Sequence, residues 1–184
     1  MFRLDMHNTG GANLNELILY ATPTGDLLAW CNDYFHIADQ LGGTEAQKYP
    51  PHCSMTGFFH RSTSRLNEAV WALGNLDVKS VDIPIDSLNI SLDKPSWLGI
   101  EIGSESLSSI ISLFSSNYKN LSDEDPIRVK EWLHLSLAYG VEDIGPFKEA
   151  LIDMDALPSE PSWEISLWQR HRHNLWKRLN FETD

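Results

Sequence analysis

Residues 132–139 read Trp-Leu-His-Leu-Ser-Leu-Ala-Tyr, and residues 52–55 read His-Cys-Ser-Met. Both stretches alternate polar and apolar side chains, and both contain a His-x-Ser tripeptide. Alternation with a period of two is typical of a half-buried strand, whose successive side chains point to opposite faces. Each stretch therefore predicts a strand that presents one histidine and one serine on the same face and sends the intervening apolar side chains into the core.

Four of the seven histidines precede Ser or Thr at this spacing, namely His7, His52, His60 and His134. Only His52 and His134 have apolar residues at the intervening positions. His7 and His60 lack that pattern, so we do not expect them to face a shared site. By the same alternation Tyr139 falls on the opposite face from His134, and we expect it in the core.

Outside these motifs, short apolar runs and turn residues predict a mixed order of strands and helices. The order strand, helix, His-x-Ser strand, helix fills the chain before about residue 78 and recurs over roughly residues 97–152, which suggests two halves related by a pseudo-two-fold axis. We therefore predict a single α+β domain over residues 1–184. Strands are expected at 16–21, 52–59, 81–85, 88–92, 97–102, 132–139 and 163–167, and helices at 27–41, at 65–73 with Ser64 as its N-cap, after Ser104, and at 146–152.

The composition is that of an ordinary globular domain, since 42% of the 184 residues are hydrophobic and 22% are charged. The net charge is −12, from 14 Lys and Arg against 26 Asp and Glu. That charge weighs against binding to duplex nucleic acid or to an anionic membrane, because such binding neutralises many phosphates at once. A local pocket for one small phosphorylated substrate is compatible with it. We expect a monomer.

No apolar run is long enough to span a membrane, and the first residues lack the apolar segment of a secretory signal. Residues 1–14 form a polar leader that we expect to be loosely ordered. The two cysteines, Cys31 and Cys53, are too few for a disulfide framework or a thiolate zinc site. We interpret them as free thiols in a reducing compartment, the cytoplasm.

Two histidines that face one cavity suit acid–base chemistry on a phosphate. One imidazole takes a proton from water while the other gives a proton to a leaving oxygen, because histidine titrates near neutral pH. Ser54 and Ser136, on the same faces as the histidines, suit hydrogen bonding to the phosphate oxygens. This chemistry needs no cofactor, and no carboxylate stands at a spacing that would complete a metal site.

Five further residues are candidates for the site. Thr56 and Phe58 share the parity of the first motif and suit the lining of a pocket, although a strand hydroxyl and a core aromatic fit them equally well. Arg170 lies just after the last predicted strand and suits a phosphate clamp or a solvated surface position. Tyr20 and Trp168 suit stacking on a base or ordinary packing.

Paired H-x-[ST]-x motifs on the strands of a small α+β domain resemble the 2H phosphoesterase superfamily, which includes the LigT-like RNA cyclic phosphodiesterases. Residues 49–59, Tyr-Pro-Pro-His-Cys-Ser-Met-Thr-Gly-Phe-Phe, and residues 132–139 are similar to the motif strands of the phosphodiesterase domain of TULA-type proteins. Residues 163–170, Trp-Glu-Ile-Ser-Leu-Trp-Gln-Arg, are similar to that domain's closing strand. The resemblance covers most of the chain.

The resemblance implies a two-lobed fold, in which each half has an antiparallel sheet with helices packed outside and the active site lies in the cleft between the halves. It also implies that His52 and His134 are the acid/base pair and that Ser54 and Ser136 bind phosphate. Both hydroxyl positions are Ser, where Thr is commoner in the family. The other parts of TULA proteins are absent from this sequence, so their signalling role is not carried over.

We therefore expect a metal-independent phosphodiesterase that hydrolyses a nucleoside 2′,3′-cyclic phosphate or the cyclic phosphate end of a short RNA, leaving a 2′-phosphate. Two alternatives stay open. The same machinery suits 2′–5′ or 3′–5′ linked oligonucleotides or cyclic signalling nucleotides. A non-catalytic nucleotide-binding module on the same fold would keep the pocket without turnover.

Overall fold

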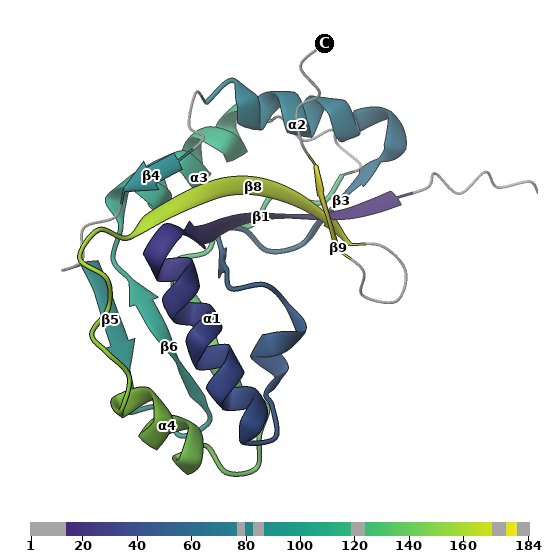
Figure 1. Cartoon of the computed structure of the whole chain (residues 1–184). Coiled ribbons are helices and arrows are strands. Elements are labelled where there is room, and N and C mark those ends of the chain that lie inside the picture. The colour runs from purple at the N-terminus through teal and green to yellow at the C-terminus, as the bar shows by residue number, and fades with distance from the viewer. Residues whose placement is uncertain (1–13, 77–79, 83–86, 119–123, 171–175, 180–184) are drawn as a thin grey trace, which may run out of the picture.

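The computed structural model of the chain describes residues 14–76, 80–82, 87–118, 124–170 and 176–179 (Figure 1). Within these ranges the chain forms four α-helices and one antiparallel sheet, so the predicted α+β class is confirmed. The helices are α1 (Gly25–Gln40), α2 (Leu66–Gly74), α3 (Glu105–Asn117) and α4 (Gly145–Ile152). The strands are β1 (Leu14–Thr24), β2 (Cys53–Ser54), β3 (Phe59–Ser62), β4 (Ser80–Asp82), β5 (Leu88–Ser91), β6 (Trp97–Ile102), β7 (His134–Tyr139), β8 (Ser162–Arg170) and β9 (Trp176–Leu179).

The strands of the sheet follow the order β4-β8-β1-β2-β7-β6-β5, with β3 also paired to β1 and β9 to β8. The family resemblance implies a sheet in each half, whereas in the structure the pairing of β2 with β7 joins the described strands into one sheet. Their junction is a single residue pair, Cys53 with Leu135. These are the central residues of the two His-x-Ser tripeptides, so both motifs lie at the junction.

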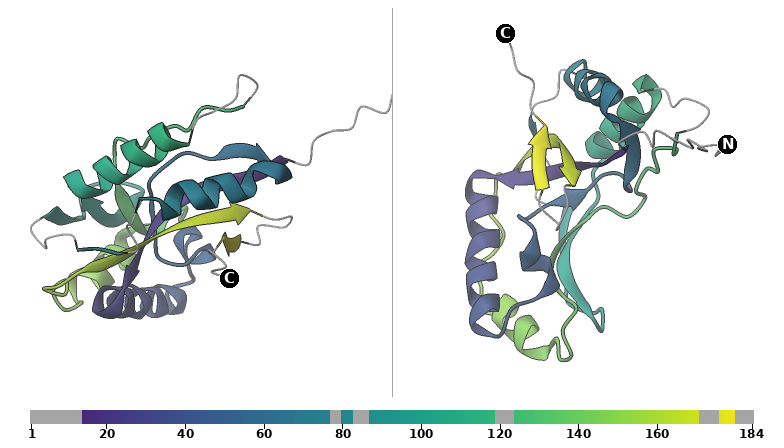
Figure 2. Two further views of the ribbon diagram at one scale, coloured as in Figure 1. Left: turned by 90° about the horizontal axis from the view of Figure 1, so that it is seen from above. Right: turned by 90° about the vertical axis from the view of Figure 1, so that its right-hand side faces the viewer.

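The alternation along β1 shows which face of the sheet carries the apolar core. Leu17, Leu19 and Ala21 are fully buried in the apolar core, whereas Ile18 and Tyr20 point to the other face by alternation. The helix pairs α1 with α4 and α2 with α3 lie on opposite sides of β1 and β8 (Figure 1). Figure 2 shows α2 and α3 side by side in both views.

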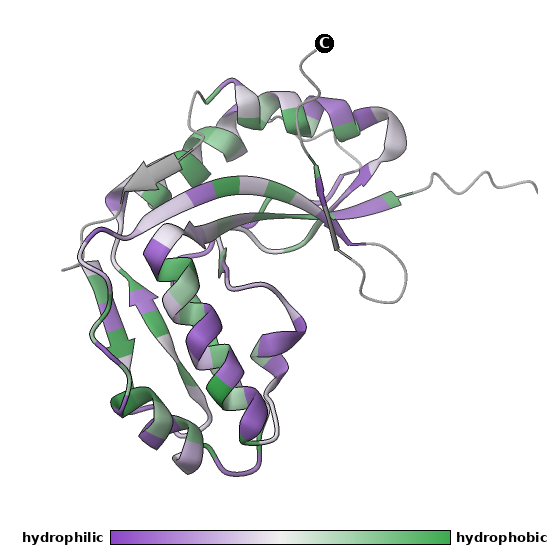
Figure 3. Cartoon of the chain, in the orientation of Figure 1, coloured by the Kyte–Doolittle hydropathy of each residue, from purple (hydrophilic) through white to green (hydrophobic). Residues whose placement is uncertain are grey.

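α1 confirms the helix predicted over residues 27–41. Its buried residues recur at helical spacing, which gives the helix one buried side, and Figure 3 shows hydrophobic and hydrophilic residues alternating along it. It ends before Gly42 and Gly43, whose φ values of 107° and 77° favour glycine. The buried residues of the helix are Leu27, Trp30, Cys31, Tyr34 and Ala38.

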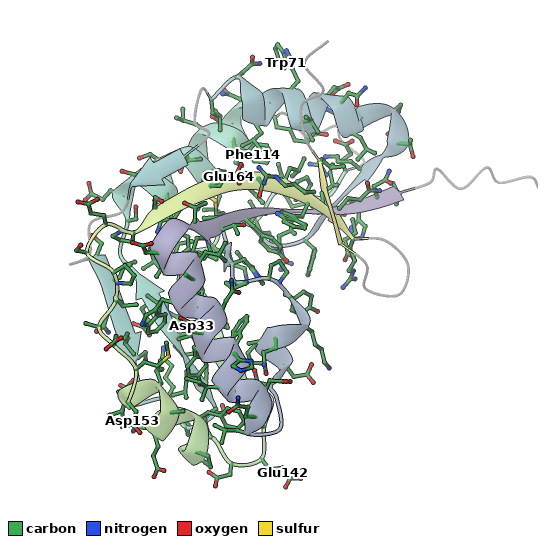
Figure 4. All side chains as sticks on the ribbon, in the orientation of Figure 1. Asp33, Trp71, Phe114, Glu142, Asp153 and Glu164 are labelled. Atoms are coloured by element: carbon green, nitrogen blue, oxygen red, sulfur yellow. The ribbon has the colours of Figure 1, made fainter. Side chains whose placement is uncertain are left out.

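α3 follows the predicted Ser104 cap, whose hydroxyl accepts a hydrogen bond from the Leu107 backbone N–H at 3.2 Å. Its side chain Phe114 is fully buried, with its ring 6.3 Å from that of Phe59 on β3, whereas Trp71 of α2 points away from the molecule (Figure 4). The predicted Ser64 cap of α2 is wrong. That hydroxyl hydrogen-bonds Ser62 instead, and α2 follows a 3-10 turn without a side-chain cap.

Some predictions concern residues outside those described. Residues 1–13 of the predicted leader, His7 among them, and residues 83–85 of the strand predicted at 81–85 belong to this group. In the described part of the chain, no helix has both the length and the apolar character needed to cross a membrane.

Candidate active site

The first motif strand is shorter than predicted because Thr56 diverts the chain. β2 contains only two residues, and the backbone N–H of Met55 still donates to the carbonyl of Leu19 at 2.9 Å. The N–H of Leu19, however, donates to the Thr56 hydroxyl at 3.1 Å, where a regular ladder would use a carbonyl. Thr56 then pairs with Val129, so the chain after β2 lies against the segment that precedes the second motif.

The antiparallel pairing of β2 with β7 brings the four motif residues together. When the register of the paired central residues is continued by one position in each direction, His52 lies opposite Ser136 and Ser54 lies opposite His134. Opposite residues on one face have Cβ atoms about 5 Å apart. Each serine therefore has a histidine of the other motif across the strand pair and the histidine of its own motif two positions away.

A cavity of about 780 Å³ lies over this junction, within the range of small-molecule sites. All four motif residues line it, and so do three of the predicted pocket residues, Tyr20, Thr56 and Phe58. Thr56 is fully buried. Because its hydroxyl already accepts a backbone hydrogen bond, Thr56 supports the wall of the cavity.

Both motif histidines are oriented by the same kind of hydrogen bond. Nδ1 of His52 lies 2.8 Å from the carbonyl oxygen of Pro50, and Nδ1 of His134 lies 3.2 Å from that of Trp132. A carbonyl oxygen only accepts, so in each ring Nδ1 carries the proton. In the neutral tautomer Nε2 is then the unprotonated nitrogen, which is the atom a general base requires.

Aromatic rings hold the two imidazoles from the side. The ring centres of Tyr20 and His52 lie 4.0 Å apart, and the Trp132 ring stacks on that of His134 with 3.8 Å between their centres. Trp97 meets His134 edge-on at 5.3 Å. Packing of this kind limits the rotamers of a catalytic side chain, which favours a fixed geometry.

Burial lowers the pKa of both His52 and His134 below the usual histidine value. The carbonyl hydrogen bonds act in the opposite direction but are weaker. A protonated His134 lowers the pKa of His52 further, and Lys130 lowers that of His134. Both imidazoles are therefore neutral near pH 7, and an anion in the cavity would favour protonation of one of them.

The hydroxyl of Ser136 is oriented by a tryptophan. The indole N–H of Trp97 donates to Ser136 Oγ at 2.9 Å, so the hydroxyl proton of Ser136 can point to an anion in the cavity. Trp97 can lie there because Gly99, the residue paired with Ser136, has no side chain. A Cβ on Gly99 would stand 2.5 Å from the Trp97 ring and would also clash with the Leu135 carbonyl.

Tyr139 lines the cavity, which corrects the prediction that it lies in the core. The pairing of β6 with β7 shifts register between Leu98 and Gly99, so Leu98 pairs with Ala138 and Gly99 with Ser136. An irregularity of this kind breaks the alternation of faces. Tyr139 consequently returns to the face of the motif residues.

Two of the predicted site residues do not line the cavity. Arg170 pairs with Glu16, and its guanidinium lies 4.9 Å from the Phe58 ring, so it supports a residue of the wall. Trp168 donates its indole N–H to Ser166 Oγ at 2.9 Å, and its ring lies 6.1 Å from that of Tyr20.

His60 is separate from the motif histidines, in agreement with its polar neighbours in the sequence. It does not line the cavity, and its Nδ1 lies 2.6 Å from a carboxylate oxygen of Asp125. Glu16 lies 3.8 Å from its other ring nitrogen. His60 therefore belongs to a polar cluster with Asp125 and Glu16 near the start of β1.

Arg128 and Lys130 both line the cavity, although neither is among the site residues predicted from the sequence. The signal was present, because residues 127–130, Ile-Arg-Val-Lys, alternate just before the second motif. Tyr49 and Trp97 were also missed, and they add to the aromatic wall. Among the described residues, no carboxylate lines this cavity. In a chain of net charge −12, a cavity lined by cations and without a carboxylate among the described residues suits an anion.

No group of three or more His, Cys, Asp or Glu in the described part of the chain is arranged to hold a metal ion. No family model matches the chain, and the comparison with curated proteins found no match.

Proposed function

We propose that this chain is a 2H-type phosphodiesterase that hydrolyses a cyclic phosphate by two-histidine acid–base catalysis without a metal. The observation that carries this proposal is the pairing of His52 and His134 in one cavity, each held at Nδ1 by a carbonyl. Serine hydroxyls beside them and a wall without carboxylates among the described residues suit a phosphate.

The reaction adds water across a phosphorus–oxygen bond. One imidazole takes a proton from water as the water oxygen bonds to phosphorus, and the bond from phosphorus to the ribose 3′ oxygen breaks. The other imidazole, protonated beforehand, gives its proton to that oxygen. The products are a 2′-phosphate and a 3′-hydroxyl, and the histidine pair is restored when the base loses its proton to solvent and the acid gains one. Ser54 and Ser136 stabilise the charge on the non-bridging oxygens.

The fold supports the same proposal. The half of the sheet that contains β4, β8 and β1 meets the half that contains β7, β6 and β5 through the short β2–β7 pairing. The cavity lies over this junction, in keeping with a two-lobed 2H domain in which each half contributes one histidine. The helix pairs α1 with α4 and α2 with α3 would then be the outer layers of the two lobes.

The test is hydrolysis of a substrate panel in excess EDTA, with products identified by ³¹P NMR. The panel contains the four nucleoside 2′,3′-cyclic phosphates, a short RNA that ends in a cyclic phosphate, a 2′–5′ oligoadenylate and a cyclic dinucleotide. Formation of a 2′-phosphate from a 2′,3′-cyclic phosphate supports the proposal. If only the oligoadenylate or the cyclic dinucleotide is hydrolysed, the proposed substrate is wrong and that compound class takes its place. Nucleotide binding without any hydrolysis contradicts the proposal.

A further inference from the structure

The mouth of the cavity holds two cations that the two-histidine reaction does not use. Arg128 and Lys130 lie on an extended segment, two residues apart, and both line the cavity. Residues at this spacing share a face of extended chain. Both side chains are exposed, which places them at the rim, whereas the motif serines are half-buried beside the histidines.

The backbone of this segment is fixed to the first motif. The N–H of Gly57 donates to the carbonyl of Arg128 at 2.8 Å, and the N–H of Lys130 donates to the carbonyl of Met55 at 3.1 Å. Gly57 also leaves room for the guanidinium, because a Cβ there would stand 3.3 Å from Nε of Arg128. The backbone from which the two cations extend is therefore held at a set position relative to the first motif.

In the segment of residues 124–130, the acidic side chains come first and the basic ones follow. The acidic side chains contact residues that do not line the cavity, since Glu124 pairs with Arg65 and Asp125 with His60. Among the described residues, neither Arg128 nor Lys130 forms an ion pair. The segment therefore adds two positive charges to a wall that has no carboxylate in the described part of the chain.

We propose that Arg128 and Lys130 bind a second phosphate of the substrate, the phosphodiester that precedes a terminal 2′,3′-cyclic phosphate in a short oligonucleotide. This inference rests on the proposed function. The reacting phosphate has one negative charge, and the histidine pair and both serines already serve it. Arginine and lysine at the rim suit a further phosphate group. The net charge of −12 disfavours a long nucleic acid, so the substrate is short.

The experiment compares two dinucleotides that end in the same 2′,3′-cyclic phosphate. One has a phosphodiester between its nucleosides, and the other has an uncharged methylphosphonate of nearly the same shape. For the wild-type chain we expect kcat/KM to be roughly tenfold higher with the phosphodiester, as two exposed charge contacts allow. The preference should weaken with added salt. The double variant Arg128→Gln, Lys130→Gln should bring the ratio close to one.

Lys148→Gln on α4 is the matched control, because it removes a positive charge from a side chain that does not line the cavity. The control should keep the wild-type ratio. If the wild-type chain hydrolyses both dinucleotides equally, the inference is wrong and the proposed function stands. If the double variant slows both substrates by the same factor, the two cations serve the reacting phosphate, and the inference is again wrong. Absence of turnover with either dinucleotide and with nucleoside cyclic phosphates overturns both proposals.

Discussion

His52 and His134 occupy equivalent settings, so their loss should have similar consequences. Each lines the cavity and donates Nδ1–H to a carbonyl two residues earlier in the chain. We predict that His52→Ala and His134→Ala each lower kcat by roughly 10²–10⁴-fold, the usual contribution of a general acid or base. Steady-state kinetics on a 2′,3′-cyclic phosphate measure this effect, with circular dichroism to check the fold.

His60→Ala is the control for these variants, because His60 also begins a His-x-Ser tripeptide but lies outside the cavity. Its kcat should match that of the wild-type chain. A loss comparable to that of His52→Ala would show that the choice of motif is wrong.

Trp97 is predicted to act through Ser136 as a positioning residue. Ser136→Ala removes one donor to the developing charge and should lower kcat by about 10²-fold. Trp97→Phe keeps the ring but removes the N–H that orients Ser136, and should lower kcat by about tenfold or less. In a chain that already has Ser136→Ala, Trp97→Phe should cause a smaller loss than in the wild-type chain, because only its packing against His134 is then changed. A double-mutant cycle measures this coupling, and additive losses would contradict it.

The elements that the sequence predicts well are those with a clear local pattern. β6 coincides with the predicted strand, and α3 begins directly after Ser104, because period-two and helical patterns decide these elements locally. The motif histidines and serines were found for the same reason. The alternation at residues 127–130 indicates an extended segment, but Arg128 was missed because its place at the cavity depends on the pairing of Val129 with Thr56, which is a contact between distant parts of the chain. Tyr139 was misplaced because the register shift in β6–β7 is likewise a property of two strands together.

α3 offers a test of such local signals. Ser104→Ala should lower the free energy of unfolding by about 1 kcal/mol, because the Leu107 N–H loses its hydrogen-bond acceptor. Ser109→Ala, at an exposed position within the same helix, should instead raise it by up to about 0.5 kcal/mol, because alanine has the higher helix propensity. Urea unfolding measures both values. Equal effects of the two substitutions would contradict the capping role of Ser104.

At the scale of the whole molecule, the lowered pKa values of both histidines link stability to pH. In the unfolded chain a histidine titrates near 6.5, whereas in the folded chain burial moves the pKa values of His52 and His134 lower. Between those values the unfolded state binds more protons, so stability is lost as pH falls below about 6.5. We predict a smaller free energy of unfolding at about pH 5.5 than at about pH 7.5, and a smaller decrease in His52→Asn. An equal decrease in the variant would contradict the assignment.

The same pKa shifts place the catalytic optimum on the acid side. The proposed reaction needs one neutral and one protonated imidazole, so kcat/KM should follow a bell whose limbs are the two pKa values of the pair in the free enzyme. Since burial lowers both, the optimum of kcat/KM should lie below about pH 6.5.

A bound phosphate favours the imidazolium, so the limbs of kcat should lie at higher pH than those of kcat/KM. Full pH–rate profiles in EDTA measure both parameters. A kcat/KM that keeps rising beyond about pH 8 would show that the group acting as acid is not a buried histidine. Activity that returns only when a divalent metal is restored would contradict the two-histidine mechanism and favour attack by a metal-bound water.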